Sequence, residues 1–247
     1  MKSMKSMKSM KNVMRVPSYK RYRFPPAIIG HAVWRSFRFA LRYRDVEELL
    51  AERGIVVTDD PVRQWCHKFG QVYANDLRRR RPQPGDKWHL DEVFIRINGA
   101  THSPWRAVDQ DGHLLDLLVQ SRRDTRAAVQ FLRKLLKGLA YVPRVVITDK
   151  RASDGAALRD VLPGVDHRQH KGRNNRAENA HQPTRERERR VRRFKDPGHA
   201  QRFRAAYGPI ANHCRPRRHR LTAEAYRATS AERCATWRAV TGIPAMA

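Results

Sequence analysis

The sequence predicts an α/β domain with a mixed sheet flanked by helices, preceded by a small all-helical domain with a helix-turn-helix. Residues 87–170 carry short runs of alternating apolar and polar residues, typical of strands, interspersed with amphipathic helical segments. Residues 44–70 read as two short amphipathic helices joined by a turn. The prolines, the glycine and the run of four arginines at residues 78–86 indicate a linker between the two parts.

The chain of 247 residues is strongly basic, with 52 lysines and arginines, 24 acidic residues and a formal net charge of +28. The net charge is +11 over residues 1–86, +4 over residues 87–170 and +13 over residues 171–247. The middle of the chain is nearly balanced in charge, and both terminal regions are strongly basic. This distribution indicates a folded core whose terminal regions bind a polyanion, most often nucleic acid. A ribosomal or chromatin-like protein would give the same total, so charge alone names no function.

Several other classes of protein are excluded by composition. The sequence has no run of 18 apolar residues, so no transmembrane helix and no membrane partner are expected. Its N-terminal region lacks the unbroken apolar stretch of a signal peptide, and residues 1–19, with a Lys-Ser-Met repeat, are expected to form a disordered basic tail. A reducing, cytoplasmic compartment is expected because no CxxC pair or disulfide-rich spacing occurs among Cys66, Cys214 and Cys234.

The predicted helix-turn-helix lies within a domain of residues 20–77. Its first helix is expected to run from about Arg44 to Arg53, with Gly54 as the C-cap. A second helix over about residues 58–69 would turn its apolar side chains inward. The side chains expected to face outward, as those of a recognition helix in a DNA major groove do, are Arg63, Gln64, His67 and Lys68. The alternative is an ordinary helical hairpin with a solvated polar face.

The elements of the second domain, residues 87–195, follow from the same patterns. A first strand is expected over residues 87–98, and 109–112 are expected to form a turn. Further strands are expected at residues 105–108, 113–121, 144–149 and 165–170. Helices are expected at residues 123–139 and 152–162, and a long basic helix from 175 to about 194 with a break at Pro183. Residues 196–247 are predicted to form a basic helical C-terminal region.

Two aspartates lie where chemistry is expected. Asp91 shares one face of the predicted first strand with His89 and with branched aliphatic residues, and a carboxylate there needs a positive partner. Asp149 ends an apolar strand, and α/β sheets bind ligands at the carboxyl ends of their strands. If the two strands are neighbours, the adjacent carboxylates favour a divalent cation such as Mg²⁺. Two such ions, about 3.5–4 Å apart, can clamp the attacking and leaving oxygens of a phosphoryl transfer, and Mn²⁺ could substitute for Mg²⁺.

A third carboxylate normally completes such a site, and Glu178 is the candidate. It lies near the start of the predicted basic helix, whereas its rivals Glu186 and Glu188 can pair with neighbouring arginines. Each carboxylate also has an ordinary explanation. Asp91 could simply pair with His89 or an arginine. An aspartate at a strand end, such as Asp149, is commonly a turn or cap residue, and Glu178 by itself would be a surface residue of a helix.

Long ordered stretches of this chain resemble one known family. These are WHLDEVFIRINGA (88–100), WRAVDQDGHLLDLLVQSRRDTRAAVQFLRKLL (105–136), VVITDKRASDGAALRD (145–160) and GRNNRAENAHQPTRERERRVRRFKDPGHAQRF (172–203). They look like the bacterial insertion-sequence transposases of family six, a DDE-class group. The stretch YRFPPAIIGHAVWRSFRFALRYRDVEELLAERGI (22–55) resembles the N-terminal region of that family.

The resemblance implies an RNase H-like catalytic domain behind a helix-turn-helix. It implies cleavage at the inverted ends of an insertion sequence and joining of the 3′-ends to target DNA by two-metal phosphoryl transfer. It also implies a homo-oligomer, a dimer or higher, in the DNA complex, and a nucleoid-associated location. The metal-binding catalytic triad would be Asp91, Asp149 and Glu178. The residues expected to hold DNA phosphate are Lys171, Arg173 and Arg185, together with Arg79 and Arg80 of the linker.

Three rival functions remain open at this point. Another RNase H-like nuclease, such as a junction-cleaving enzyme, would share the triad but needs no sequence-reading helix-turn-helix. An inactive transposase could act only as a DNA-binding protein. A zinc protein is a remote third, because His167, His170, His213, Cys214 and His219 show no paired ligand spacing.

Overall fold

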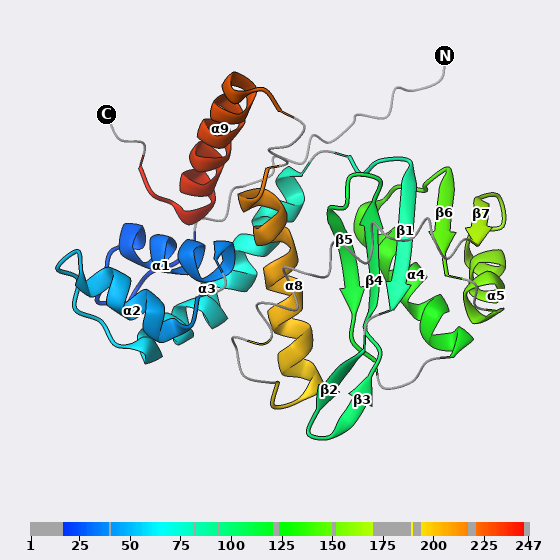
Figure 1. Ribbon diagram of the computed structural model, residues 1–247, viewed down its shortest axis with the longest axis horizontal. Coiled ribbons are helices and arrows are strands. Elements are labelled where there is room, and N and C mark those ends of the chain that lie inside the picture. The colour runs from blue at the N-terminus through cyan, green and yellow to red at the C-terminus, as the bar shows by residue number, and fades with distance from the viewer. Residues whose placement is uncertain are drawn as a thin grey trace, which may run out of the picture.

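The computed structural model describes residues 17–39, 41–81, 83–92, 94–120, 124–149, 152–169, 189, 194–216 and 221–244. Within these ranges, three helices precede a mixed sheet with two helices packed on it, and two long helices follow (Figure 1). The expected α/β class, with a helical part ahead of the sheet, is confirmed. No helix in these ranges is long and apolar enough to cross a membrane.

The helical part consists of α1 (Pro26–Arg38), α2 (Tyr43–Ala51) and α3 (Asp59–Arg80). A turn that contains Gly54, with φ +72°, separates α2 from α3, and the positive φ explains the glycine. The helix α3 is much longer than the expected 58–69 and continues into the predicted linker. The physical reason is that Tyr73, Ala74 and Leu77 extend its buried stripe by two further turns.

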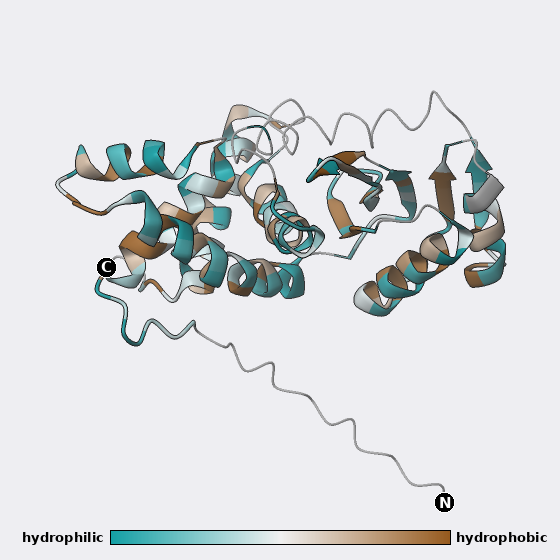
Figure 2. Cartoon of the chain, turned by 90° about the horizontal axis from the view of Figure 1, so that it is seen from below, coloured by the Kyte–Doolittle hydropathy of each residue, from teal (hydrophilic) through white to brown (hydrophobic). Residues whose placement is uncertain are grey.

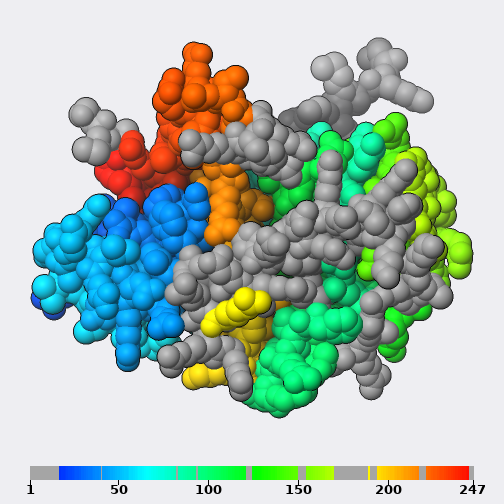
Figure 3. Space-filling model, viewed as in Figure 1, coloured from blue at the N-terminus to red at the C-terminus, as the bar shows by residue number. Residues whose placement is uncertain are grey.

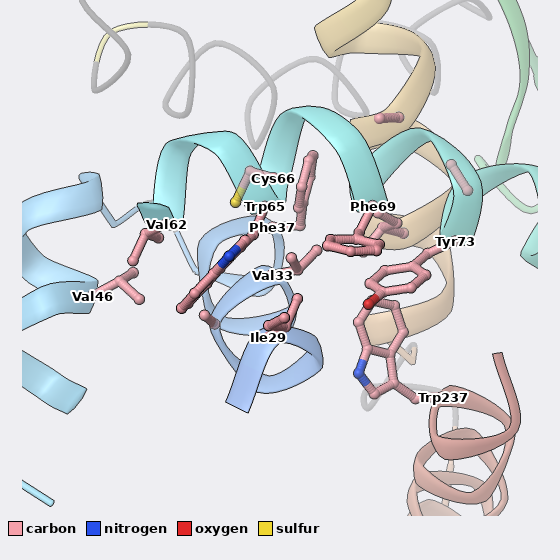
Figure 4. Close-up of a cluster of buried hydrophobic side chains, with 14 of the residues drawn as sticks. Ile29, Val33, Phe37, Val46, Val62, Trp65, Cys66, Phe69, Tyr73 and Trp237 are labelled. Carbon is pink, nitrogen blue, oxygen red and sulfur yellow. The ribbon is translucent and has the colours of Figure 1, made fainter. Parts of the chain in front are cut away.

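The core of the helical part is completed by helices from the other end of the chain. Figure 4 shows Val33 and Phe37 of α1 packed among the aromatic side chains of α3. The C-terminal helices α8 (Pro197–Cys214) and α9 (Ala223–Thr241) add the remaining side of this cluster. For example, the Trp237 ring of α9 lies edge-on to the Tyr73 ring of α3, with 5.3 Å between the ring centroids. Residues near both ends of the chain therefore share one hydrophobic core.

The main sheet has five strands in the order β5-β4-β1-β6-β7. The central strand β1 (Lys87–Glu92) pairs antiparallel with β4 (Trp105–Asp109), which pairs antiparallel with β5 (Leu114–Leu118). On its other side β1 pairs parallel with β6 (Val145–Thr148), and β6 pairs parallel with β7 (Asp166–Gln169). The turn and strands predicted between residues 105 and 170 are therefore present.

Two helices, α4 (Thr125–Leu139) and α5 (Ala152–Val161), cover one face of the sheet (Figure 2). The Asp124 side chain caps α4 by accepting a hydrogen bond from the backbone N–H of Ala127 at 2.8 Å. The apolar stripe of α4 packs on the side chains of Trp88 and Leu90 in β1, as its periodicity predicts. The opposite face of β1 is therefore the one that carries His89 and Asp91.

The first strand predicted over residues 87–98 is in fact two strands in different sheets. After β1 ends, β2 (Ile95–Ile97) pairs with β3 (Ala100–His102) as a separate hairpin, and Figure 3 shows this hairpin beside the start of α8. Its two-residue turn, Asn98 and Gly99, has φ of 50° and 81°, as tight hairpins require. The aliphatic side chains of β2 pack on Phe194 and Ala200, so they do not continue the face of Asp91 as predicted.

The helix α8 joins the helical part to the edge strand β5. The Gln201 side chain accepts a hydrogen bond from the backbone N–H of Val119 at 2.7 Å, and Asn212 Nδ2 donates to the carbonyl of Leu114 at 3.1 Å. Between them, Gly208 approaches Leu114 so closely that an added Cβ would lie 2.0 Å from Leu114 Cδ2. The absence of a side chain at this position lets the helix lie against the strand.

We expect Gly208→Ala to lower the free energy of unfolding by about 1–3 kcal/mol, because the new methyl group displaces Leu114 from the interface. The matched control is Gly138→Ala in α4, where nothing lies within 4 Å of the added Cβ. That control should stabilise the protein by about 0.5–1 kcal/mol through helix propensity alone. Urea unfolding of both variants measures the difference, and equal changes would show that α8 does not dock on β5 as described.

Candidate active site and nucleic-acid interface

The two predicted aspartates lie at the carboxyl ends of neighbouring parallel strands, Asp91 as the next-to-last residue of β1 and Asp149 directly after β6. In the pairing of β1 with β6, His89 lies opposite Ile147. The pairing ends there, and Asp91 and Asp149 each lie two residues further along, so a continued register would place them on the same face as His89 and Ile147. Both side chains are half-buried. Two aspartates that are 58 positions apart in the sequence thus lie at the carboxyl ends of neighbouring parallel strands.

The end of β6 is held in place by the neighbouring strand β7. The Thr148 side chain is fully buried, and its hydroxyl donates to the carbonyl of Asp149 at 3.0 Å and lies 2.8 Å from Nε2 of His167. Burial lowers the pKa of His167, and the charge of Arg159 acts in the same direction. Because the hydroxyl gives its one proton to Asp149, the Nε2–H of a neutral His167 imidazole can donate to the hydroxyl oxygen. The two hydrogen bonds together fix the backbone of Asp149 relative to the sheet.

Sequence reasoning missed a buried arginine in the strand next to β1, at the register position opposite Asp91. Arg106 of β4 is 7% exposed and is the direct cross-strand partner of Asp91 in the antiparallel pairing. Its signal in the sequence is a charged residue within the strand Trp105–Asp109, all five residues of which are buried. The alternation of polar and apolar residues in WRAVD predicts a strand. It does not predict that both faces of this strand are buried, so it does not identify Arg106 as a buried residue.

The third predicted carboxylate, Glu178, lies outside the described residues, as do its rivals Glu186 and Glu188. The predicted phosphate-binding residues Lys171, Arg173 and Arg185 also lie outside them. Within the ranges that the structure describes, no group of three or more His, Cys, Asp or Glu side chains could hold a metal ion. The convergence of Glu178 with the two aspartates therefore remains a prediction.

The outer face of α3 carries the four residues predicted to contact DNA, and all four are exposed. Two of them, Arg63 and Gln64, donate hydrogen bonds to Asp60, which lies one turn earlier in the helix. Arg63 Nε donates to Asp60 Oδ1 at 3.0 Å, and Gln64 Nε2 donates to Asp60 Oδ2 at 2.6 Å. These bonds lower the pKa of the Asp60 carboxyl. A DNA contact by Arg63 or Gln64 would therefore compete with Asp60.

The other two residues of this face contact more distant parts of the chain. His67 stacks on His199 of α8, with 5.6 Å between ring centroids, and Lys68 Nζ lies 4.5 Å from the ring centroid of Tyr22. Burial lowers the pKa of both histidines, and nearby Arg202 adds to the effect. The exposed face of α3 is thus continuous with the N-terminal half of α8, which sequence reasoning did not indicate.

The arginine run at the end of α3 divides into two pairs. Arg79 and Arg80 form ion pairs with Asp76 and remain on the outside of the helix. Arg78 donates to the carbonyl of Ala205 at 2.6 Å, and Arg81 donates to the carbonyl of Leu115 at 3.1 Å. The second pair therefore ties α3 to α8 and to the sheet. The first pair is exposed, and an anionic partner would compete with Asp76 for it.

These features define a class of α/β protein with a mixed sheet, aspartates at the carboxyl ends of two neighbouring parallel strands and a basic helical part. The family model of the DDE domain of IS240-type transposases matches residues 85–217, more than half of the chain. The chain belongs to this DDE-domain family. The kinship with insertion-sequence transposases expected from the sequence is confirmed, and the finer placement in family six remains a prediction.

Named relatives agree with this family. The transposase for insertion sequence-like element IS431mec of Staphylococcus aureus is 33% identical over 146 residues, which is 59% of this chain and 65% of that protein. The transposase of IS257 in transposon Tn4003, also from Staphylococcus aureus, matches to the same extent. The match therefore spans just under two thirds of the relatives' length. Among solved structures, the Mos1 transposase catalytic domain has a TM-score of 0.41 and 14% identity, with 73% of this chain and 96% of that chain covered.

We expect the protein to lose stability as pH falls below about 6.5, the ordinary pKa of histidine. The lowered pKa values of His67, His199 and His213 mean that the unfolded chain takes up protons that the folded chain resists. This stability is complete above the ordinary pKa and is lost as pH falls toward the lowered values. Urea unfolding at several pH values should show a flatter slope for His199→Gln than for the unchanged protein, and equal slopes would contradict this account.

Proposed function

We propose that this chain is a metal-dependent DNA transposase that cleaves the ends of an insertion sequence and joins their 3′-ends to target DNA. The observation that carries the proposal is the alignment of Asp91 with Asp149 on neighbouring parallel strands of a DDE-domain sheet. Ligands of α/β sheets bind at the carboxyl ends of such strands. The names of the relatives, transposases of insertion sequences, support DNA ends as the substrate.

The donor set at this sheet edge fits a divalent cation. Two carboxylates side by side repel each other, and oxygen ligands suit a hard ion such as Mg²⁺, or Mn²⁺ in its place. Asp91 and Asp149 would hold the ion or ions, and Glu178 would complete the ligand set. Bound there, such ions supply activation of the attacking hydroxyl and stabilisation of the leaving oxygen.

The remaining work falls to residues of this chain that bind and orient DNA. Arg63, Gln64 and His67 on the outer face of α3 would read base edges of the element's ends, as a recognition helix does. Lys68 and the exposed pair Arg79 and Arg80 would hold backbone phosphate, which adds affinity without sequence information. Lys171, Arg173 and Arg185 would hold phosphate near Glu178. The rigid packing of α3 on α8 would keep these groups in one orientation.

Two further features belong to the same proposal. The protein would act as a homo-oligomer, a dimer or higher, because both ends of an element must be held in one complex. It would act on the inverted ends and on target DNA in a nucleoid-associated, cytoplasmic location. The experiment that tests the proposal is a strand-transfer assay with the element's terminal DNA and Mg²⁺, and the absence of both cleavage and joining by a folded protein would refute it.

Asp91→Asn should abolish cleavage and strand transfer while DNA binding stays nearly unchanged. The substitution keeps the size of the side chain but removes a charge that the metal ions need, so we expect a loss of at least about 1,000-fold, or about 4 kcal/mol of barrier. The control is Asp166→Asn, an exposed aspartate of β7 whose partner is Arg168. Equal loss of binding and cleavage by a folded Asp91→Asn variant would mark Asp91 as structural.

Arg63→Ala should reduce the preference for the element's own ends over random DNA, because a good bidentate base contact contributes about 1–3 kcal/mol. Removing Arg79 and Arg80 together should weaken binding to both DNAs alike. It should also flatten the dependence of log affinity on log salt by about 0.9 for each phosphate that the protein no longer neutralises. Binding titrations on both DNAs at several salt concentrations measure these effects. If Arg63→Ala leaves the affinity ratio unchanged, Arg63 contacts only the backbone.

A further inference from the structure

The β2–β3 hairpin begins close to the candidate active site and has one apolar and one polar face. Its first strand starts at Ile95, shortly after Asp91 near the end of β1. The side chains of Ile95 and Ile97 are buried, whereas Arg96 and its cross-strand partner Thr101 are exposed. Residues 95–102 include no aspartate or glutamate. The outward face of the hairpin is therefore polar and positively charged.

The apolar face of the hairpin packs against the start of α8. The buried side chains of β2 share a small core with Phe194 and Ala200. The tip of the hairpin adds a hydrogen bond, in which Asn98 Nδ2 donates to the backbone carbonyl of Lys195 at 2.7 Å. Figure 3 shows the two segments side by side. The exposed cation of β2 is thus held next to the exposed side chain of Lys195.

The start of α8 in turn contacts the outer face of α3. The ring of His199 meets the ring of Phe194 edge-on, with 5.5 Å between the centroids. On its other side His199 stacks on His67 of α3 at 5.6 Å. A continuous series of packed side chains therefore connects the hairpin that follows β1 with the predicted recognition face of α3.

Exposed cations accompany this series of contacts. The side chains of Arg96, Lys195 and Arg202 are all exposed, and none of them forms an ion pair with another residue that the structure describes. Burial lowers the pKa of His199, and the nearby charges of Arg202 and Lys195 act in the same direction. Asp196 opposes this effect, but its carboxylate is engaged as the cap of α8, where it accepts from the backbone N–H of His199 at 2.7 Å.

We propose that Arg96, Lys195 and Arg202 form a connecting surface that binds the phosphate backbone of duplex DNA between the outer face of α3 and the end of β1. DNA is the partner that fits, because the connecting surface continues the face of α3 and presents cations without protein carboxylates to neutralise them. The destination of the DNA at Asp91 rests on the proposed function, whereas binding to the connecting surface requires no chemistry.

The connecting surface is tested with the triple variant Arg96→Gln, Lys195→Gln and Arg202→Gln. The probe is a random-sequence DNA duplex, titrated at several salt concentrations, because phosphate contacts carry no sequence information. Each phosphate that the protein no longer neutralises should flatten the dependence of log affinity on log salt by about 0.9, so the triple variant should flatten it by about 2–3. If the triple variant does not fold in a urea titration, Arg202→Gln replaces it, with an expected change of about 0.9.

The matched control removes two arginines and one lysine from elsewhere on the catalytic domain. Arg126 and Lys137 of α4 and Arg144 ahead of β6 are also exposed, and they too form no ion pair within the described part of the chain. The helix α4 covers the face of the sheet opposite Asp91, so Arg126→Gln, Lys137→Gln and Arg144→Gln together should leave the salt dependence nearly unchanged. Arg126→Gln is the control for the single variant.

The outcomes separate the connecting surface from the proposed function. Equal flattening by the two triple variants would overturn the proposal, because only the total charge of the protein would then matter. An unchanged salt dependence in the Arg96, Lys195 and Arg202 variant would also overturn it and would leave the proposed transposase activity standing. Flattening confined to that variant would support the connecting surface, even if the unchanged protein neither cleaved nor joined DNA with Mg²⁺, a result that would contradict only the proposed chemistry.

Discussion

The parallel pairing of β1 with β6 is the constraint on which the candidate site depends. These strands are joined through a hairpin, two antiparallel strands and the helix α4, so the chain passes across one edge of the sheet and returns to the other side of β1. The register then determines which residues become neighbours, and it pairs His89 with Ile147, two residues before Asp91 and Asp149. A shift of one residue in either strand would turn one carboxylate to the face covered by α4 and α5.

The packing of α3 against α8 determines the position of the predicted DNA-contacting residues on the outer face of α3. It buries Phe69 and Tyr73 of α3 in a core shared with the C-terminal helices. It also brings His199 onto His67 and anchors Arg78 on the carbonyl of Ala205. The outer face of α3 is therefore rigidly connected to the sheet through α8, so a DNA segment bound on that face would have a defined position relative to the strand ends.

The polar groups of the sheet are arranged by face. One face carries the aromatic and aliphatic residues that pack under α4 and α5, and the other carries His89, Asp91 and Arg106. The proposed metal site would therefore lie on the face of β1 that α4 and α5 do not cover.

The sequence by itself determined the features that depend on local periodicity. The apolar stripe of α4, the buried strand β6 and the outward face of α3 all follow from spacing within one element, where side-chain direction is determined by backbone geometry. Other features depended on contacts between distant residues. The end of β1 at Glu92, the length of α3, the shared core with α8 and α9, and the cross-strand position of Arg106 were decided only in the folded chain. Strand register and helix docking join segments far apart in the sequence, and no local pattern specifies which residues will meet.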